Sequence, residues 1–309
     1  MTADLPDITL IIPTRQRPEQ LAGCLASLRS LDYPREHLQV IVVDDGSDPP
    51  VKSVVMPYQG HLPLELVVQS GAGPAAARNR GAEAARGEFL AFTDDDCRPA
   101  ADWLLRLAER LMRSPERAVG GLTLNALPEN IYSSASQMLI DHLYAYYNRD
   151  PENATFLTSS NLALSRSLFR QVGGLNPNYL RAAGEDRELC DRWLQRGWKM
   201  TFASEAVVYH RHSLTLGSFW RQHWTYGRGA WHYRLDRAAR ERGPVRVEPP
   251  RFYTRLLARP FTTHQPPGRC VALVTLLTLT QVANAAGFLF EALLGGSRRR
   301  SEAEQHPET

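Results

Sequence analysis

Three consecutive carboxylates, Asp94, Asp95 and Asp96, follow the apolar run at residues 88–92. That run predicts a buried strand, so the acids stand at its carboxyl end. Like charges this close repel one another, and the cluster therefore requires a counter-charge. Magnesium and manganese prefer oxygen ligands of this kind and also hold phosphates. The triplet predicts a divalent-cation site; an isolated triplet would more simply be a solvated acidic turn.

A regular alternation of strands and helices must position these acids. Apolar runs predict strands at residues 8–12, 38–43, 64–68 and 88–92, and helices are expected between and after them at 19–31, 75–85, 102–113 and 131–147. This order predicts an α/β fold with a doubly wound, mostly parallel sheet covered on both faces. Ligands of such sheets bind beyond the carboxyl ends of the strands. Three polar turns fall at those ends: Thr14-Arg15, Asp44-Asp45 and Asp94 to Asp96.

The second half of the chain supplies further candidate groups. Gly184-Glu185-Asp186 begins a predicted helix that runs to about residue 196. Two acids in a first turn are also favoured simply by the helix dipole. His210 and His212 follow an apolar run at 206–209. A lone histidine is often structural, but beside an acidic cluster it is a candidate metal ligand.

Composition narrows the function classes. The chain has 309 residues, of which 43% are apolar, and its net charge is +3. So slight a positive charge does not predict nucleic-acid binding. The four cysteines are far apart and form no CxxC pair, so we expect reduced thiols and a cytoplasmic protein. Residues 1–7 have no basic region followed by an apolar stretch, so we expect no secretory signal.

Five motifs, in order, carry a resemblance to a known family. They are Ile11-Ile12-Pro13-Thr14-Arg15, Val42-Val43-Asp44-Asp45-Gly46-Ser47, Ala77-Arg78-Asn79-Arg80-Gly81, Thr93 to Asp96, and Gly184-Glu185-Asp186. Together they resemble glycosyltransferase family 2, over roughly Ile8 to Trp231. The resemblance implies a GT-A fold and transfer of a sugar from a nucleotide diphosphate donor with inversion at the anomeric carbon.

The resemblance implies a nucleoside pocket at the first strand ends. Thr14, Asp45 and Arg78 would form it, with Pro13, Arg15 and Asp44 beside them. A carboxylate at Asp45 can accept a hydrogen bond from a pyrimidine ring nitrogen. The expected donor is a nucleotide-sugar, with a UDP-sugar as the first choice and the base left open. Taken alone, the aspartates could equally cap a helix and the arginine could be a solvated surface residue.

The acidic triplet resembles the family's DxD motif. Asp96 is then the best metal ligand, Asp94 reaches the ribose or the metal, Asp95 lies beside the nucleotide, and His210 is a further metal ligand. The expected cofactor is manganese or magnesium, which would neutralise the leaving diphosphate.

Asp186 matches the family's catalytic base, which takes the proton of the acceptor hydroxyl. Glu185 is expected to orient the acceptor or the base. Processive members carry Gln-x-x-Arg-Trp, and this pattern is missing from the corresponding segment, residues 221–228. The expected reaction is therefore a single addition to a hydroxyl-bearing glycan, lipid or small molecule.

The resemblance divides the chain into functional parts. Residues 1–122 would bind the nucleotide-sugar, and 123–233 would form the acceptor-side half of the same domain. A basic, proline-containing linker is expected at 234–269, a terminal apolar helix at 270–295 and a disordered tail at 296–309.

The apolar segment has an ambiguous pattern. It carries no charge between Arg269 and Glu291, and its length is near the ~20 residues that span a bilayer. Yet its polar residues fall roughly on one helical stripe. It is open whether the helix lies on a membrane or a partner, spans a bilayer, or belongs to the core. Attachment at the inner face of the cell membrane is therefore one expectation.

Two other functions remain open. A nucleotidyltransferase also pairs a doubly wound sheet with acidic metal sites, but it would carry a glycine- and lysine-rich phosphate loop after the first strand. That turn here reads Pro13-Thr14-Arg15-Gln16-Arg17. A non-catalytic carbohydrate-binding or scaffold protein would need neither a metal nor Asp186.

Overall fold

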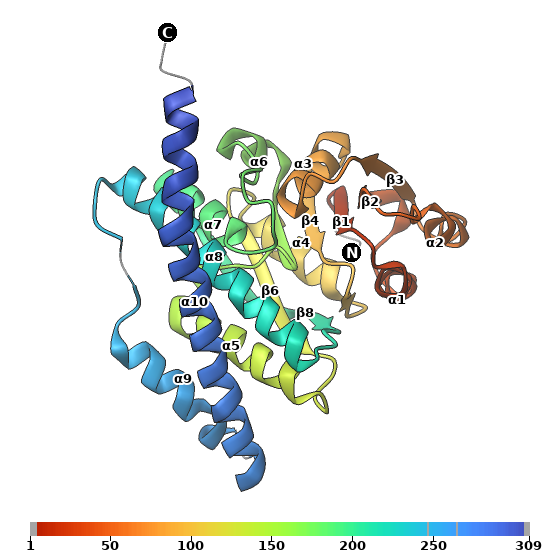
Figure 1. Ribbon diagram of the computed structural model, residues 1–309. Coiled ribbons are helices and arrows are strands. Elements are labelled where there is room, and N and C mark those ends of the chain that lie inside the picture. The colour runs from red at the N-terminus through yellow and green to blue at the C-terminus, as the bar shows by residue number, and fades with distance from the viewer. Residues whose placement is uncertain (1–4, 246, 264, 306–309) are drawn as a thin grey trace. The chain divides into compact units, whose positions relative to one another are not determined.

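The structure is a computed structural model that describes residues 5–245, 247–263 and 265–305. Its strands form one eight-stranded sheet with the order β3-β2-β1-β4-β7-β6-β8-β5. The β1–β2, β2–β3, β1–β4 and β6–β8 pairs are parallel, and the rest are antiparallel. The mostly parallel α/β fold is confirmed (Figure 1). The strands are β1 (Ile8–Thr14), β2 (Leu38–Asp45), β3 (Leu64–Gln69), β4 (Phe89–Thr93), β5 (Cys97–Pro99), β6 (Ala118–Asn125), β7 (Asn161–Ser165) and β8 (Met200–His210).

Helices connect the strands and continue beyond the last of them. The predicted helix at 131–147 has the bounds that α5 has in the structure. The α-helices are α1 (Pro18–Leu28), α2 (Lys52–Val55), α3 (Pro74–Ala84), α4 (Trp103–Arg113), α5 (Ile131–Tyr147), α6 (Arg166–Val172), α7 (Glu185–Gln195), α8 (Leu216–Glu241), α9 (Pro250–Thr262) and α10 (Pro267–Gln305); short 3-10 turns stand at Arg35–His37, Met56–Tyr58 and Pro151–Asn153.

The chain divides into two compact units. The first comprises residues 1–128, 143–180 and 186–212, and it contains the whole sheet. The parallel strands β1, β2 and β4 are buried on both faces, as their nearly continuous apolar sequences require, whereas β3 at the edge is partly exposed. On β1, the side chains of Ile8, Leu10 and Ile12 face one core, whereas that of Ile11 faces the other. These two cores fix the strands that carry the candidate site.

Strand register brings the polar strand ends to one edge of the sheet. Thr14 at the end of β1 pairs with Asp44 on β2, and Ile11 pairs with Phe92 on β4. The short strand β5, which the sequence did not predict, pairs antiparallel with β8 so that Cys97 lies opposite His210. The acidic triplet and the histidine are therefore neighbours, although more than a hundred residues separate them in the chain.

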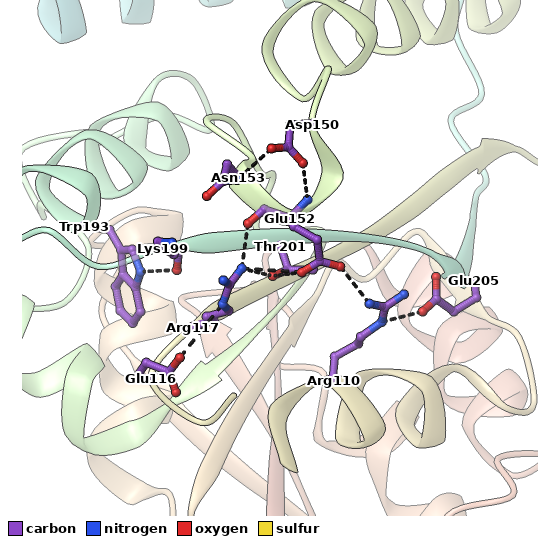
Figure 2. A network of polar contacts seen from close by, with 10 residues as sticks. All are labelled: Arg110, Glu116, Arg117, Asp150, Glu152, Asn153, Trp193, Lys199, Thr201 and Glu205. Carbon is purple, nitrogen blue, oxygen red and sulfur yellow. Dashed lines mark hydrogen bonds and ion pairs between the residues drawn. The ribbon is translucent and has the colours of Figure 1, made fainter. Parts of the chain in front are cut away.

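A network of polar contacts holds β8 in place at Thr201 and Glu205 (Figure 2). Arg110 of α4 lies 2.7 Å from the carboxylate of Glu205 and 3.0 Å from that of Glu152. Arg117 donates to the backbone carbonyl of Glu152 and to the hydroxyl of Thr201. Single exposed ion pairs contribute little, but shared partners restrict several side chains at once. The network thus ties β8 to α4 and to the 3-10 turn at Pro151–Asn153.

Buried polar bonds hold the centre of the sheet. The Nε1–H of Trp103 donates to the side-chain oxygen of Asn161 at 2.8 Å, and the amide nitrogen of Asn161 donates to the carbonyl of Ala206 at 3.0 Å. A Cβ on Gly121 would lie 2.1 Å from that carbonyl, so only glycine leaves room. This close packing sets where β8 runs relative to the acidic strand end.

The second unit comprises residues 129–142, 181–185 and 213–309. Its long helices α8 and α10 approach closely, because a Cβ on Gly227 would lie 2.0 Å from the carbonyl of Asn284 and one on Gly287 would lie 2.1 Å from that of Trp224. The guanidinium of Arg228 lies 2.5 Å from the carboxylate of Glu291.

The C-terminal region is more regular than its sequence indicates. Residues 234–269, expected as a linker, contain the end of α8 and the whole of α9. Helix α10 continues to Gln305 through most of the stretch expected to be a disordered tail. The last residues of that expected tail, 306–309, lie outside the described residues.

Candidate functional site

Arg17 neutralises two of the three acids at the carboxyl edge. Its guanidinium lies 2.9 Å from the carboxylate of Asp95 and 2.5 Å from that of Asp96. The hydroxyl of Thr14 also donates to Asp95 at 2.8 Å. Burial and the neighbouring acids raise the pKa of Asp95 to about 7, although Arg17 opposes the shift. The counter-charge that the triplet requires is thus supplied in part by an arginine that sequence reasoning did not single out.

Arg78 neutralises the remaining acid. It is almost fully buried, and its guanidinium lies 2.5 Å from the carboxylate of Asp94. Helix α3 can bring it so close because Gly81 packs on β1, where a Cβ would lie 2.5 Å from the Cγ2 of Ile11. The alanine-rich sequence of α3 therefore serves a close helix–strand contact as well as helix formation.

His210 lies beside Asp96, where a metal ligand was expected. Its Nε2 lies 3.1 Å from Oδ1 of Asp96. Burial alone would lower the pKa of His210, but the Asp96 carboxylate outweighs burial and raises it. The pKa of Asp96 is lowered, because the charges of His210 and Arg17 outweigh the opposing effect of burial. Asp96 is therefore an ionised carboxylate.

The donor set at this point fits a divalent cation. The ligand atoms of Asp96, Cys97 and His210 all lie within 4.8 Å of one another. A carboxylate oxygen and an imidazole suit manganese, whereas the thiol does not suit a hard cation. Burial also raises the pKa of Cys97 well above its usual range, so the thiol is protonated. Among the described residues, Asp96 and His210 are thus the best-placed ligands, with Asp94 on the same short turn.

Asp44 and Asp45 have separate surroundings despite being adjacent. Asp44 is fully buried, and its two oxygens accept the backbone N–H groups of Ser47 and Val51, which closes the turn after β2. Asp45 accepts the N–H groups of Ala72 and Gly73 at 2.7 and 2.9 Å. We therefore assign Asp44 to the turn and keep Asp45 as the candidate base contact.

The other nucleoside candidates lie around Asp45. The guanidinium of Arg15 is exposed and lies 3.9 Å from the Asp45 carboxylate. Pro13 and Thr14 form the end of β1, which pairs with the end of β2. The glycines of the loop before α3 have positive φ, which turns the backbone N–H groups toward Asp45. Asp45 thus orders the loop that leads to Arg78.

Asp186 lies in the first turn of α7, within the electrostatic reach of the same edge. Its carboxylate is buried near Ser159, whose polar groups favour the ionised form. Burial raises the pKa of Asp186, and the nearby charge of Asp94 raises it further, while Arg78 and Ser159 oppose the shift. Glu185 is buried at the start of the same helix. Arg78 therefore links the base candidate electrostatically to the acidic triplet.

Two of the three tryptophans of α8, Trp224 and Trp231, pack against aromatic rings of α10. The rings of Trp224 and Phe290 are 5.3 Å apart, and those of Trp231 and Phe288 are 5.1 Å apart. These contacts join α8 to α10 within the second unit. They favour core packing over stacking on a sugar for these two side chains.

Two family models match segments of the chain. Residues 9–173 match the family model described as glycosyl transferase family 2. Residues 141–213 match the model described as the N-terminal domain of galactosyltransferase. The two matched segments together contain the acidic triplet, Asp186 and His210.

Named relatives are glycosyltransferases of archaea and bacteria. The chain is 27% identical over 231 residues to glycosyltransferase AglE of Haloferax volcanii, with 74% of each chain covered. It is 30% identical over 230 residues to the pre-mycofactocin glycosyltransferase of Mycobacterium tuberculosis, covering 72% of this chain and 47% of that one. The chain therefore spans about three quarters of the first relative and about half of the second.

Solved structures share the fold. The mannosyltransferase PcManGT from Pyrobaculum calidifontis, in complex with GDP-Man and Mn²⁺, superposes with a TM-score of 0.66 at 19% identity, covering 93% of this chain and 88% of that one. GalNAc-T7 with UDP, GalNAc and Mn²⁺ gives a TM-score of 0.56 at 16% identity, covering 85% and 58%. At these identities the likeness establishes the fold alone.

Proposed function

The chain belongs to glycosyl transferase family 2, and from this premise we propose that it is an inverting, metal-dependent enzyme that adds one sugar to an acceptor hydroxyl. One observation carries the proposal: Asp96, the last acid of the triplet, lies beside His210 at the sheet edge, and Arg78 acts on both Asp94 and Asp186. The residues proposed to bind the metal, to bind the diphosphate and to act as the base thus belong to one unit.

Asp186 is the proposed base, with Glu185 beside it. A raised pKa makes Asp186 a stronger proton acceptor than an ordinary aspartate. It would take the proton of the acceptor hydroxyl while that oxygen attacks the anomeric carbon. A single displacement of this kind inverts the configuration, because the acceptor approaches opposite the leaving diphosphate.

Asp96, His210 and Asp94 would hold the divalent cation. When bound, the cation would neutralise charge that develops on the leaving diphosphate. Arg78 and Thr14 would then complete the nucleotide side of the site, with Asp95 held by Thr14 and Arg17. Two structures of the same fold contain Mn²⁺ with a nucleotide or nucleotide-sugar, which supports this class of cofactor and donor.

Asp45 is proposed to select the base. A carboxylate accepts a hydrogen bond from a ring N–H, which uracil and guanine possess and adenine lacks. We propose a UDP-sugar as the donor, with the uracil N–H directed at Asp45. The carboxylate oxygen that accepts from Gly73 retains lone-pair capacity for this bond.

Calorimetry with nucleoside diphosphates tests the proposed function. We expect UDP to bind, with Mn²⁺ raising its affinity about tenfold or more, because the cation would offset the repulsion between the carboxylates and the diphosphate. ADP should bind far more weakly under the same conditions. A scaffold protein would show no gain from Mn²⁺, and a nucleotidyltransferase would instead require a nucleoside triphosphate and release pyrophosphate. Tighter binding of GDP than UDP would overturn the uracil assignment only.

The acceptor side supports single additions. Residues 221–228, where a processive enzyme of this family would carry its motif, lie inside α8 and pack it against α10. No Gln-x-x-Arg-Trp is present in the sequence. The acceptor is proposed to be a hydroxyl-bearing glycan, lipid or small molecule.

We further propose that α10 holds the enzyme at the inner face of the membrane. Residues 267–294 are long and apolar enough to cross a bilayer by length and composition. One side of α10 packs on α8, however, and Glu291 on that side is paired with Arg228. If α10 alone crossed the bilayer, Glu291 would lose its contact with Arg228. We therefore propose that α10 lies on the membrane surface.

The outward side of α10 suits a lipid environment. It exposes Val282, Leu289 and Leu293, each more than half accessible. The hydroxyls of Thr275 and Thr278 donate to backbone carbonyls one turn earlier, so they need no water. Between Glu248 and Glu291 the charged side chains are all arginines: Arg251, Arg255, Arg259 and Arg269. Apolar area together with basic charge favours an anionic membrane surface.

Vesicle flotation tests this location. We expect the protein to float with vesicles that contain an anionic lipid and much less with neutral ones. The double variant Leu289→Glu, Leu293→Glu should lose flotation, whereas Val68→Glu, which charges an exposed site on β3, should retain it. If the protein floats equally well with neutral and anionic vesicles, and still floats after an alkaline carbonate wash, then α10 crosses the bilayer. That result would overturn the surface assignment.

A further inference from the structure

Arg17 occupies a carboxylate that the proposed cation also requires. Its guanidinium contacts Asp96 at 2.5 Å and Asp95 at 2.9 Å. Asp96 is also the acid that lies beside His210. A guanidinium and a divalent cation on the same carboxylate would stand only a few ångströms apart and would repel each other strongly in a partly buried site. Arg17 contacts Oδ2 of Asp96 and His210 faces Oδ1, so a cation bound beside His210 would share this carboxylate with the guanidinium and weaken its hold on Asp96.

The backbone before Arg17 is built to hold it there. Gln16 has a φ of +56°, a left-handed conformation that is uncommon for residues other than glycine. Its N–H donates to the hydroxyl of Ser47 at 2.9 Å, which fixes this turn to the end of β2. Pro18 then begins α1 directly after Arg17. The chain direction at Arg17 is thus set by the turn that follows β2 and by the start of α1.

The side chain of Arg17 remains able to move. It is 41% exposed, whereas those of Asp95 and Asp96 are 3% and 6% exposed. The guanidinium therefore reaches the buried acids from the solvent side. Moving it away from Asp96 requires no change in the core, and its bond with Asp95 can persist.

We propose that Arg17 is an exchangeable counter-ion of the acidic edge and a positioning residue for the diphosphate. Without the donor it neutralises Asp95 and Asp96. When the cation takes Asp96, Arg17 keeps Asp95 and directs its released N–H groups to the diphosphate, for which a planar guanidinium is well shaped. This inference rests on the proposed function, because it assumes that a cation and a nucleoside diphosphate bind here.

Arg17 should therefore affect the two ligands in opposite directions. It competes with the free cation, so it weakens binding of Mn²⁺ alone. It contributes donors to the diphosphate, so it strengthens binding of UDP together with Mn²⁺. A residue that merely ties α1 to the strand ends would not produce opposite signs, since loosening the site would weaken both ligands.

Calorimetric or paramagnetic-resonance titration of Mn²⁺ tests the proposal in purified protein. For Arg17→Met we expect Mn²⁺ alone to bind about tenfold more tightly and UDP, at saturating Mn²⁺, about tenfold more weakly. Arg17→Lys keeps the positive charge but loses the planar set of N–H donors of the guanidinium. Mn²⁺ alone should therefore bind nearly as in the wild type, while UDP should bind more weakly. Arg106→Met, which removes an exposed arginine paired with Asp102, is the matched control and should change neither.

The outcomes separate this inference from the function on which it rests. If wild type and Arg17→Met both fail to bind Mn²⁺, the metal-dependent function is wrong and the inference falls with it. If the wild type binds Mn²⁺ and UDP but Arg17→Met binds both more weakly, the function stands and the exchange is overturned. Opposite shifts in Arg17→Met, with the weaker UDP binding also seen in Arg17→Lys, would establish it.

Discussion

Asp186→Asn is expected to reduce sugar transfer about 1,000-fold while leaving nucleotide binding nearly unchanged. Asparagine has the shape of aspartate and fits the same buried place, but it cannot take a proton from the acceptor hydroxyl. Turnover should be measured by release of UDP from a donor and acceptor pair, and binding by calorimetry with UDP and Mn²⁺. Retained binding with lost turnover is the signature of a base that acts in the transition state.

The pH dependence adds an independent check on the base. Burial raises the pKa of Asp186, so protonation should silence it at a pH where an ordinary aspartate is still charged. Activity of the wild type should therefore rise as the pH passes this raised pKa. The residual activity of Asp186→Asn should not show this rise, because asparagine has no acidic proton to lose.

Two other acids of α7 show whether the base is Asp186: one serves as a control and the other is the alternative base. Asp191→Asn changes an aspartate that accepts a hydrogen bond from Gln195, and it should leave turnover nearly intact. Glu185→Gln tests the adjacent acid, which we expect to affect acceptor binding more than proton transfer. Near-complete loss of turnover in Glu185→Gln, with Asp186→Asn active, would move the base to Glu185.

Much of the fold could be predicted because each buried parallel strand is a local pattern. The apolar runs of β1, β2 and β4 each end in polar residues, and the helix at 131–147 carries its apolar residues within one continuous segment. The family resemblance and the α/β architecture were accordingly predicted and are confirmed. Each of these strands and helices is indicated by the apolar residues of its own short segment, without information from distant parts of the chain.

Features that depend on distant partners could not be predicted in this way. Strand β5 has only three residues and exists because β8 pairs with it. Helix α9 was not predicted, and its residues were expected to form a linker. Its sequence is rich in arginine and proline, which obscures the helical spacing of its buried residues Phe252 and Leu256. In the sequence, Arg17 is one polar residue of a turn, and its partner Asp96 lies 79 residues further along the chain.

The candidate site shows the same division between local and distant information. Sequence placed Asp44 and Asp45 together, but successive side chains of a strand point to opposite faces. Asp44 consequently closes the turn after β2, whereas Asp45 orders the loop before α3. The roles proposed for Asp45, Asp96, His210 and Asp186 stay predictions, and each now has defined neighbours against which a variant can be designed.

Asp96→Asn is expected to weaken binding of Mn²⁺ about 100-fold and to reduce transfer by a similar factor, since a neutral amide is a poor ligand for a hard cation. The charges of His210 and Arg17 lower the pKa of Asp96, so its carboxylate is ionised throughout the working pH range. The amide removes that charge without emptying the space. Titration of Mn²⁺ in the absence of nucleotide measures the effect directly.

Partner variants decide whether Asp96 acts through the cation or only through structure. If the cation binds between Asp96 and His210, then His210→Ala should weaken Mn²⁺ binding about tenfold, and the double variant should be little worse than Asp96→Asn, because both side chains serve one ion. Asp7→Asn, which alters an exposed aspartate paired with His37, is the matched control and should leave Mn²⁺ binding unchanged. Unaltered Mn²⁺ affinity in folded Asp96→Asn would show that the ion binds elsewhere, and the link between the acidic edge and the diphosphate would then be lost.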